Sequence, residues 1–203
     1  VKMRQQGLAR DTLMMLEHPP VITVGRDGHD ENFADSPITP YFIERGGDVT
    51  FHGPGQLVVY FIFNLTRRGR DLHRFMDNVQ EGIIRALAQY GIEAQRGVEN
   101  TGVWVGKKKI ASIGIAVKHW ITYHGAAINL NTKLTEFNKI NPCGLNAKVM
   151  TSAKRLLKKP IETEEFRRVL LTKYGEVFGT DFSPIDLESL AEELESQSGG
   201  YEI

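Results

Sequence analysis

RGGDVTFHGPGQ, residues 45–56, runs directly into the apolar stretch LVVYFIF, residues 57–63. An apolar run this short, rich in β-branched and aromatic residues, predicts a strand that is buried on both faces. The glycines before it allow positive φ angles and a close approach of the backbone to another group. A loop that exposes backbone N–H groups beside a sheet suits an anionic or carbonyl-bearing ligand. A plain turn before a core strand would not need Arg45, Thr50 and His52, so the stretch favours a binding site.

Composition limits the classes of protein to consider. The chain has 203 residues with 25 basic and 25 acidic side chains, so no overall charge directs it to nucleic acid or to a membrane surface. The longest apolar run is far shorter than the roughly 18 residues that cross a bilayer, and no signal peptide is evident. The single cysteine, Cys143, excludes an internal disulfide, and no residue spacing is typical of metal ligands. We therefore expect a cytoplasmic protein without a metal site.

Hydrophobic spacing predicts a mixture of strands and helices. The expected strands are residues 11–17, 21–25, a hairpin of 101–105 with 109–117, and a further strand at 124–130. Amphipathic helices are expected at 71–90 and 163–178, and another from Ser183, with that serine as its N-cap. Strands dominate early and helices late. We expect one domain over residues 1–203, with a helical appendage from about residue 160.

Cys143 is the candidate nucleophile. It lies in a Pro-Cys-Gly turn, where rigid backbone and small neighbours leave the thiol with little steric cover. A thiol of this kind reacts as a nucleophile when a nearby cation favours the thiolate. Lys109, His52 and His124 are the available partners, and sequence spacing leaves a Cys–Lys and a Cys–His pair both open. The other histidines are expected to be surface or structural residues: His18, His29, His73 and His119.

Four blocks in this order resemble the signature of the octanoyltransferases of lipoate biosynthesis. They are RGGDVTFHGPGQLV (45–58), KIASIGI (109–115), WITYHGAAIN (120–129) and INPCG (140–144). The N-terminal EHPPV (17–21) matches as well, so the resemblance covers about residues 11–178. It implies an α+β fold, with a mixed β-sheet flanked by helices, similar to the catalytic domain of biotin and lipoate protein ligases. Phe51 departs from the pattern, because the family usually has tyrosine at this position.

The resemblance also implies an activity. These enzymes transfer octanoyl from octanoyl-acyl carrier protein to a lysine of lipoyl domains, in 2-oxoacid dehydrogenases and in the glycine-cleavage H protein, without a cofactor. Carried over to this chain, Cys143 forms the acyl thioester, and Lys109 activates the thiol and moves protons. The implied acyl-binding residues are Arg45, Gly46, Gly47, Asp48, Val49, Thr50, Phe51, His52, Ser112, Ile113, Gly114, Gly125, Ala126 and Ala127.

Two other functions share this fold. An ATP-dependent lipoate or biotin ligase is one, but it does not need the Pro-Cys-Gly turn, and HGPGQ replaces its nucleotide-binding pattern. A binding module without catalysis is the other, and the presence of both Cys143 and Lys109 argues against it. The sequence therefore favours a cysteine-dependent acyltransferase.

Overall fold

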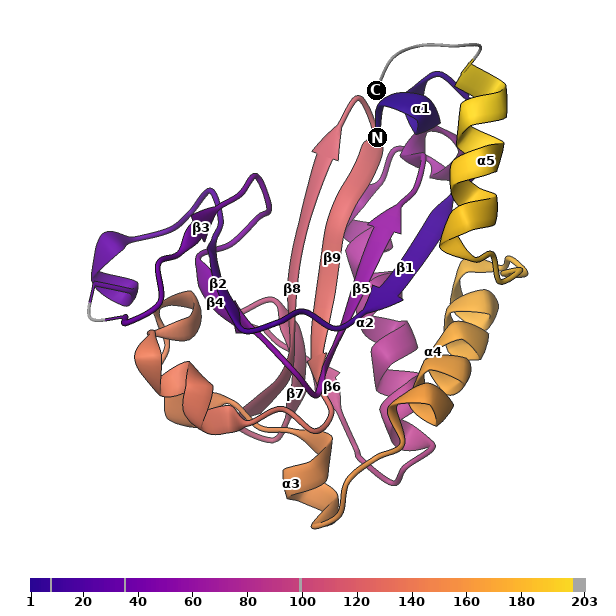
Figure 1. Cartoon of the computed structure of the whole chain (residues 1–203). Helices are drawn as coiled ribbons and strands as arrows, with labels where there is room; N and C mark the ends of the chain where they lie inside the picture. The colour runs from indigo at the N-terminus through magenta and orange to yellow at the C-terminus, as the bar shows by residue number, and fades with distance from the viewer. Residues whose placement is uncertain (8, 35, 99, 199–203) are drawn as a thin grey trace.

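The computed structural model describes residues 1–7, 9–34, 36–98 and 100–198, and in these residues the strands form two sheets (Figure 1). The larger sheet has six antiparallel strands in the order β1-β5-β9-β8-β7-β6. The smaller sheet has the order β3-β2-β4, with β2 parallel to β3 and antiparallel to β4. The predicted fold class is confirmed: β2 and β3 form a parallel pair in the smaller sheet, and a single parallel bridge joins Lys109 of β8 to Met150.

The predicted strands and helices are present, but the structure has further short elements, and one of them is a strand at residues 49–52, within the stretch predicted as a loop. The larger sheet contains β1 (Thr12–Leu16), β5 (Gln56–Ile62), β6 (Gln95–Arg96), β7 (Gly102–Val105), β8 (Lys108–Lys118) and β9 (Ile121–Asn129). The smaller sheet contains β2 (Val21–Val24), β3 (Tyr41–Phe42) and β4 (Val49–His52). The α-helices are α1 (Lys2–Gln5), α2 (Leu72–Ala88), α3 (Ala153–Leu157), α4 (Thr163–Phe178) and α5 (Leu187–Ser198). No helix among the described residues is long and apolar enough to cross a membrane.

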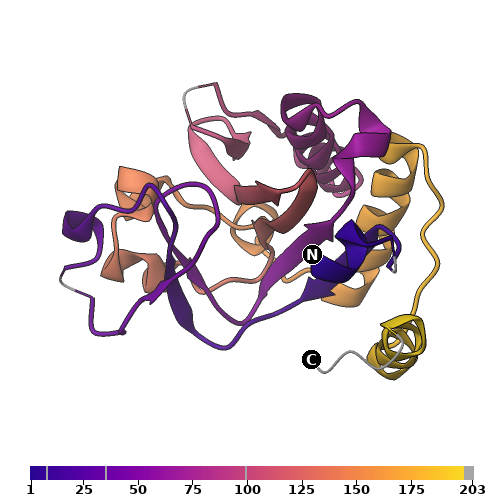
Figure 2. The same ribbon diagram turned by 90° about the horizontal axis from the view of Figure 1, so that it is seen from above.

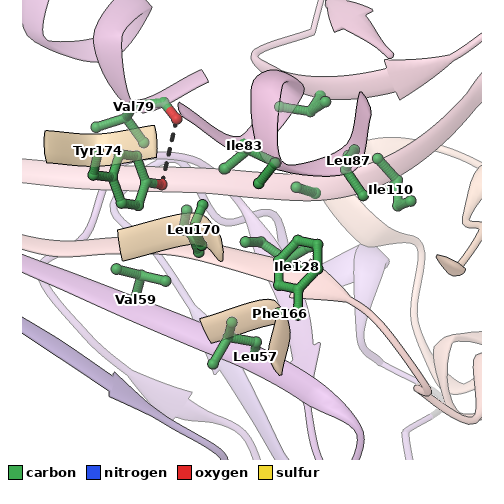
Figure 3. Packing of buried hydrophobic residues seen from close by; sticks show 14 of the residues in the cluster. Leu57, Val59, Val79, Ile83, Leu87, Ile110, Ile128, Phe166, Leu170 and Tyr174 are labelled. Atoms are coloured by element: carbon green, nitrogen blue, oxygen red, sulfur yellow. Dashed lines mark hydrogen bonds between the residues drawn. The ribbon is translucent and has the colours of Figure 1, made fainter. Parts of the chain in front are cut away.

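The main core lies between the larger sheet and helices α2 and α4. Val59 and Phe61 of β5 point into this core and are fully buried, as are Leu170 and Tyr174 of α4. The Tyr174 hydroxyl donates a hydrogen bond of 3.4 Å to the Val79 carbonyl of α2 (Figure 3). The segment predicted as a helical appendage therefore contributes a helix to the main core. The smaller sheet lies on the other face of the larger sheet (Figure 2).

The last helix begins three residues later than its predicted first turn. Asp186, and not Ser183, is its cap: the Asp186 carboxylate accepts hydrogen bonds of 2.8 Å from both the backbone N–H and the hydroxyl of Ser189. The prediction of Ser183 as the N-cap was wrong. A carboxylate offers two acceptor oxygens to the first turn, whereas the serine offers one.

Gly82 sets how closely α2 and α4 approach each other. A β-carbon at this position would lie 2.3 Å from the ring of the buried Tyr174. Alanine would improve helix propensity by about 1 kcal/mol, but overpacking of a rigid core costs about 1–3 kcal/mol. We therefore expect Gly82→Ala to lower the free energy of unfolding by about 1 kcal/mol in urea titrations. Because Tyr174→Leu removes the clashing ring, the double variant should lose less than the sum of the two single variants. Additive losses would contradict this account.

Candidate functional site

A cavity of about 350 Å³ lies between the two sheets. Side chains alternate along a strand, so β5, β8 and β9 present one residue set to the helices and the other set to this cavity. The cavity set includes Val58, Tyr60, Ser112, Gly114, Gly125 and Ala127, and Ile113, His124 and Ala126 of the same strands also border the cavity. From the smaller sheet, β2 and β4 contribute Val21, Thr23, Thr50 and His52. A cavity of this size falls in the range of small-molecule sites, and its floor is made largely of small residues.

Most of the residues predicted to bind an acyl chain lie around this cavity. They are Arg45, Gly46, Gly47, Thr50, His52, Ser112, Ile113, Gly114, Gly125, Ala126 and Ala127, and Cys143 lines the cavity with them. Asp48, Val49 and Phe51 were also predicted to bind the acyl chain, but they do not line the cavity. Val49 and Phe51 pack in a second core cluster, where Phe51 meets the ring of Phe137 at 5.6 Å. Alternation along β4 explains this split, because Thr50 and His52 take the opposite face of the strand.

The burial of Phe51 also accounts for the missing tyrosine hydroxyl. The Phe51 side chain is almost fully buried among apolar groups, including Phe137 and Ile140. A hydroxyl in such surroundings costs free energy unless it finds a hydrogen-bond partner. Phenylalanine at this position therefore stabilises the second core and contributes no group to the cavity.

Gly114 allows the glycine-rich loop to cross directly over β8. A β-carbon at Gly114 would lie 2.7 Å from the Gly46 carbonyl oxygen and 3.1 Å from Cδ of Arg45. A side chain at this position would have to displace backbone. Because Gly114 has no side chain, the glycine-rich loop packs against β8 and forms one wall of the cavity.

Lys109 reaches Cys143 because β8 contains a bulge. Val103 of β7 pairs with Ala111, but the next residue, Trp104, pairs with Lys109, so Ile110 is an extra residue in β8. Ile110 and Ala111 are consecutive and both fully buried in the main core. A bulge of this kind reverses the direction of the side chains on one side of it relative to those on the other. Without it, strict alternation would place Lys109 with Ala111 in the core.

The Lys109 ammonium lies 3.9 Å from the Cys143 thiol. It also donates a hydrogen bond of 2.5 Å to Oδ1 of Asn100, and it lies 5.7 Å from the centre of the Trp104 ring. Lys109 is only 2% exposed, and its burial lowers the pKa of its ammonium, while Cys143 opposes this shift. Gly102 of β7 makes room for the chain, since a β-carbon there would lie 2.6 Å from Cε of Lys109. The pair thus combines a nucleophilic atom with a group able to release and recover a proton.

Cys143 occupies an unusual backbone conformation. It has φ 55° and ψ 37° in the 3-10 segment Pro142–Gly144, a left-handed conformation that costs a non-glycine residue roughly 1–2 kcal/mol. Neighbouring contacts hold the turn in place: the Asn141 N–H donates to the Asn32 carbonyl at 2.8 Å, and the Asn32 side chain donates to Asp48 at 2.5 Å. Strain of this kind is typical of functional sites, where surrounding structure determines the conformation.

Asp48 is a positioning residue in this arrangement. Its carboxylate accepts hydrogen bonds from the Asn32 side chain, from the His29 N–H at 3.1 Å and from the Val49 N–H at 2.7 Å. These bonds join the start of β4 to the segment that holds the Cys143 turn. Asp48 was predicted to contact the acyl chain, but the structure places it behind the cavity wall.

Arg45 brings a second positive charge to the cavity. It is 7% exposed, and its guanidinium donates to the Thr23 carbonyl at 2.7 Å and to the Gly46 carbonyl at 3.1 Å. Burial lowers the pKa of Arg45, while Cys143 and Asp48 are the main groups that raise it. Its charge therefore acts on the Cys143 side of the cavity together with that of Lys109.

His52 is held in one tautomer by a chain of hydrogen bonds. The Phe51 carbonyl can only accept, so the Gln56 amide nitrogen faces it at 3.2 Å, and Oε1 of Gln56 faces Nδ1 of His52 at 2.8 Å. Nδ1 must then carry the proton, which leaves Nε2 as an acceptor. Burial lowers the pKa of His52 to about 4, so the ring is neutral at pH 7.

His18 lines the same cavity, although it was expected to be a surface or structural residue. Its Nε2 lies 2.6 Å from the Tyr60 hydroxyl, and its ring centre lies 5.8 Å from that of His52. His124 completes the polar cluster, with its ring centre 6.4 Å from that of Tyr60. The position of His18 in the N-terminal EHPPV block was the available signal, because that block accompanies the other cavity-lining blocks.

Comparison with known proteins places the chain in a family. A family model of the lipoyl protein ligase A/B catalytic domain matches residues 1–175. An octanoyltransferase of Geobacter metallireducens is 45% identical over 83% of this chain and 79% of its own length. One of Caldanaerobacter subterraneus subsp. tengcongensis is 47% identical over 88% and 81%. The structure of a lipoate-protein ligase A bound with ATP has a TM-score of 0.72 at 15% identity, over 94% of this chain and 82% of that one, which supports the shared fold.

The depressed pKa of His52 makes folding stability depend on pH. Between pH 6.5 and about 4 the unfolded chain holds a proton that folded His52 does not, so this histidine destabilises the fold as pH falls through that window. The loss approaches about 3 kcal/mol near pH 4. Urea unfolding at several pH values should show a shallower pH dependence for His52→Gln than for the native chain. His73→Gln, on the exposed face of α2, is the matched control, and equal slopes in all three proteins would refute the burial of a neutral His52.

Proposed function

This chain belongs to the lipoyl protein ligase A/B catalytic-domain family and is an acyltransferase of lipoate biosynthesis, and we propose that it transfers octanoyl through a thioester on Cys143. The donor is octanoyl-acyl carrier protein. The acceptor is a lysine of lipoyl domains in 2-oxoacid dehydrogenases and in the glycine-cleavage H protein. The observation that carries this proposal is the 3.9 Å separation of the Lys109 ammonium and the Cys143 sulfur, because Cys143 lines a cavity floored by small residues.

In the first step, the Cys143 thiolate attacks the carbonyl carbon of the donor thioester. The Cys143 thiol first loses its proton to solvent; a new C–S bond then forms to Cys143, the bond to the donor sulfur breaks, and the leaving thiolate takes a proton from solvent. Lys109 and Arg45 favour the attacking thiolate through their positive charge. One thioester replaces another of similar energy, so the step needs no ATP.

In the second step, the neutral amine of the acceptor lysine attacks the acyl-Cys143 carbonyl. The C–N bond forms, the C–S bond breaks, and one proton leaves the attacking nitrogen. Lys109 suits the removal of this proton, since burial lowers the pKa of its ammonium and so favours the neutral amine. The product is an amide, which makes the second step downhill.

The acyl chain fits the cavity floor. Val58, Ala127 and Ser112 form one row across β5, β9 and β8, and Tyr60, Gly125 and Gly114 form the next. The small side chains of Ala127 and Ser112 leave space along the sheet for an extended methylene chain, and the glycine-rich loop packed over Gly114 closes one side of that space. Main-core side chains fill the other face of the same strands, which keeps the floor rigid.

Replacing the thiol tests the nucleophile directly. We expect Cys143→Ser to fold like the native chain but to lose octanoyl transfer, because a hydroxyl is a far weaker nucleophile than a thiolate at neutral pH. Intact mass spectrometry of native protein mixed with octanoyl-acyl carrier protein should show one octanoyl adduct, located on Cys143. Transfer by the folded Cys143→Ser variant would exclude the thioester. A lack of adduct together with ATP-dependent modification of a lipoyl domain would instead indicate a ligase.

Two substitutions separate the electrostatic and proton-transfer roles of Lys109. Arginine keeps a positive charge near the thiol but does not release a proton, whereas methionine supplies neither. Lys109→Arg should form the acyl-enzyme yet pass octanoyl to the lipoyl domain at least about 100-fold more slowly. Lys109→Met should be slow in both half-reactions, measured by quenched mass spectrometry. If Lys109→Arg completes the second half-reaction at the native rate, another group removes the proton.

A further inference from the structure

The balanced net charge of the chain conceals an uneven distribution. Residues 100–161 contain eleven lysines or arginines and a single acidic residue, Glu136. Glu136 already forms ion pairs of 3.2 and 2.5 Å with Lys133 and Lys139. The rest of this segment therefore carries positive charge that its own acidic residues do not compensate. Both Lys109 and Cys143 lie within it.

Three exposed lysines of this segment lie next to the catalytic pair. Lys107 and Lys108 directly precede Lys109 at the β7–β8 turn, and Lys148 follows Cys143 by five residues. The Lys108 ammonium donates a hydrogen bond of 2.8 Å to the Lys148 carbonyl, so the two segments lie side by side, and the backbone bond of 2.9 Å from the Thr151 N–H to the Lys109 carbonyl joins them independently of these side chains. None of the three forms an ion pair with another described residue. Lys107, Lys108 and Lys148 are called the lysine face below.

Two exposed acidic residues beside the Cys143 turn belong to a different part of the fold. Asp30 and Glu31 are exposed on the short 3-10 segment Asp30–Asn32, which contacts the turn from the side of the smaller sheet. The lysine face, in contrast, lies at the start of β8 in the larger sheet and at Lys148 beside it. The surface around Cys143 is thus positive where β8 begins and acidic where the smaller sheet meets the turn.

We infer that the lysine face docks the acyl donor, an acidic carrier protein that presents its thioester on a flexible arm. This inference rests on the proposed function. The donor brings a neutral thioester on an acidic protein, and a positive surface attracts it during encounter. The acceptor must bring its own lysine towards Lys109 and Arg45, so additional positive charge would oppose its approach. The lysine face therefore suits the first half-reaction and not the second.

Charge reversal at the lysine face tests the inference. The variant Lys107→Glu/Lys108→Glu/Lys148→Glu should lower the second-order rate of acyl-enzyme formation from octanoyl-acyl carrier protein by roughly 10- to 100-fold at low salt. Its rate with a small uncharged octanoyl thioester should stay native, which also shows that the variant is folded. The native rate with the carrier should fall as salt rises, and the variant should lose this dependence. The triple glutamine variant should give an intermediate rate.

The chain offers a matched control in a second exposed basic cluster, Arg67, Arg70 and Arg74. Arg70 lies 5.7 Å from the ring of Trp120, beyond the far end of β8, and eleven strand residues put this cluster about 30 Å from the lysine face. Reversal of these three charges should leave the carrier rate unchanged. Native rates in the lysine-face variant, or a selective loss in the arginine-cluster variant, would overturn the inference. Failure of the proposed function would look different, because native protein would then acquire no octanoyl from either donor.

Discussion

The bulge at Ile110 is the constraint on which the site depends. A strand gives each residue one of two directions, and Lys109 would share the core direction of Ala111 without the extra residue. A buried ammonium in the main core, far from an acceptor, would be strongly unfavourable. The bulge instead places this ammonium between Asn100 and Cys143, while both Ile110 and Ala111 remain in the core. The one-residue shift in strand pairing thus keeps Ile110 and Ala111 in the core and brings the Lys109 ammonium to Cys143.

The other half of the site depends on Asp48. Its carboxylate links the glycine-rich segment to Asn32, and Asn32 in turn holds the Cys143 turn through its backbone carbonyl. The same connection keeps Cys143 in a left-handed conformation that an isolated turn would leave. Because Asp48 holds the turn from behind, the cavity in front of it remains free for a ligand. The cysteine is therefore positioned by the smaller sheet and the lysine by the larger one, and the site exists only where the two meet.

The two faces of the larger sheet have different roles: one packs in the main core and the other lines the cavity. The helix face is filled by large apolar residues such as Val59, Phe61 and Tyr174, which supply most of the buried area. The cavity face carries glycine, alanine and serine, which contribute little hydrophobic burial but leave room for the cavity. This division explains why a strand such as β8 mixes buried isoleucines with residues that usually weaken a sheet.

Local patterns in the sequence were enough to predict the main helices and strands of this protein and to single out Cys143 and Lys109 as candidate reactive groups. Hydrophobic spacing located helices α2 and α4 and the β7–β8 hairpin, because such patterns are local. In residues 49–52, apolar and polar side chains alternate, and this pattern indicates that Thr50 and His52 share one face of a strand and Val49 and Phe51 the other. The resemblance to the family blocks did not distinguish the two faces. Only the tertiary structure decided that Lys109 pairs with Cys143, that Asp48 supports the turn, and that His18 joins the cavity. These relations join residues far apart in the chain, and a bulge or a long-range hydrogen bond leaves no periodic signal in the sequence.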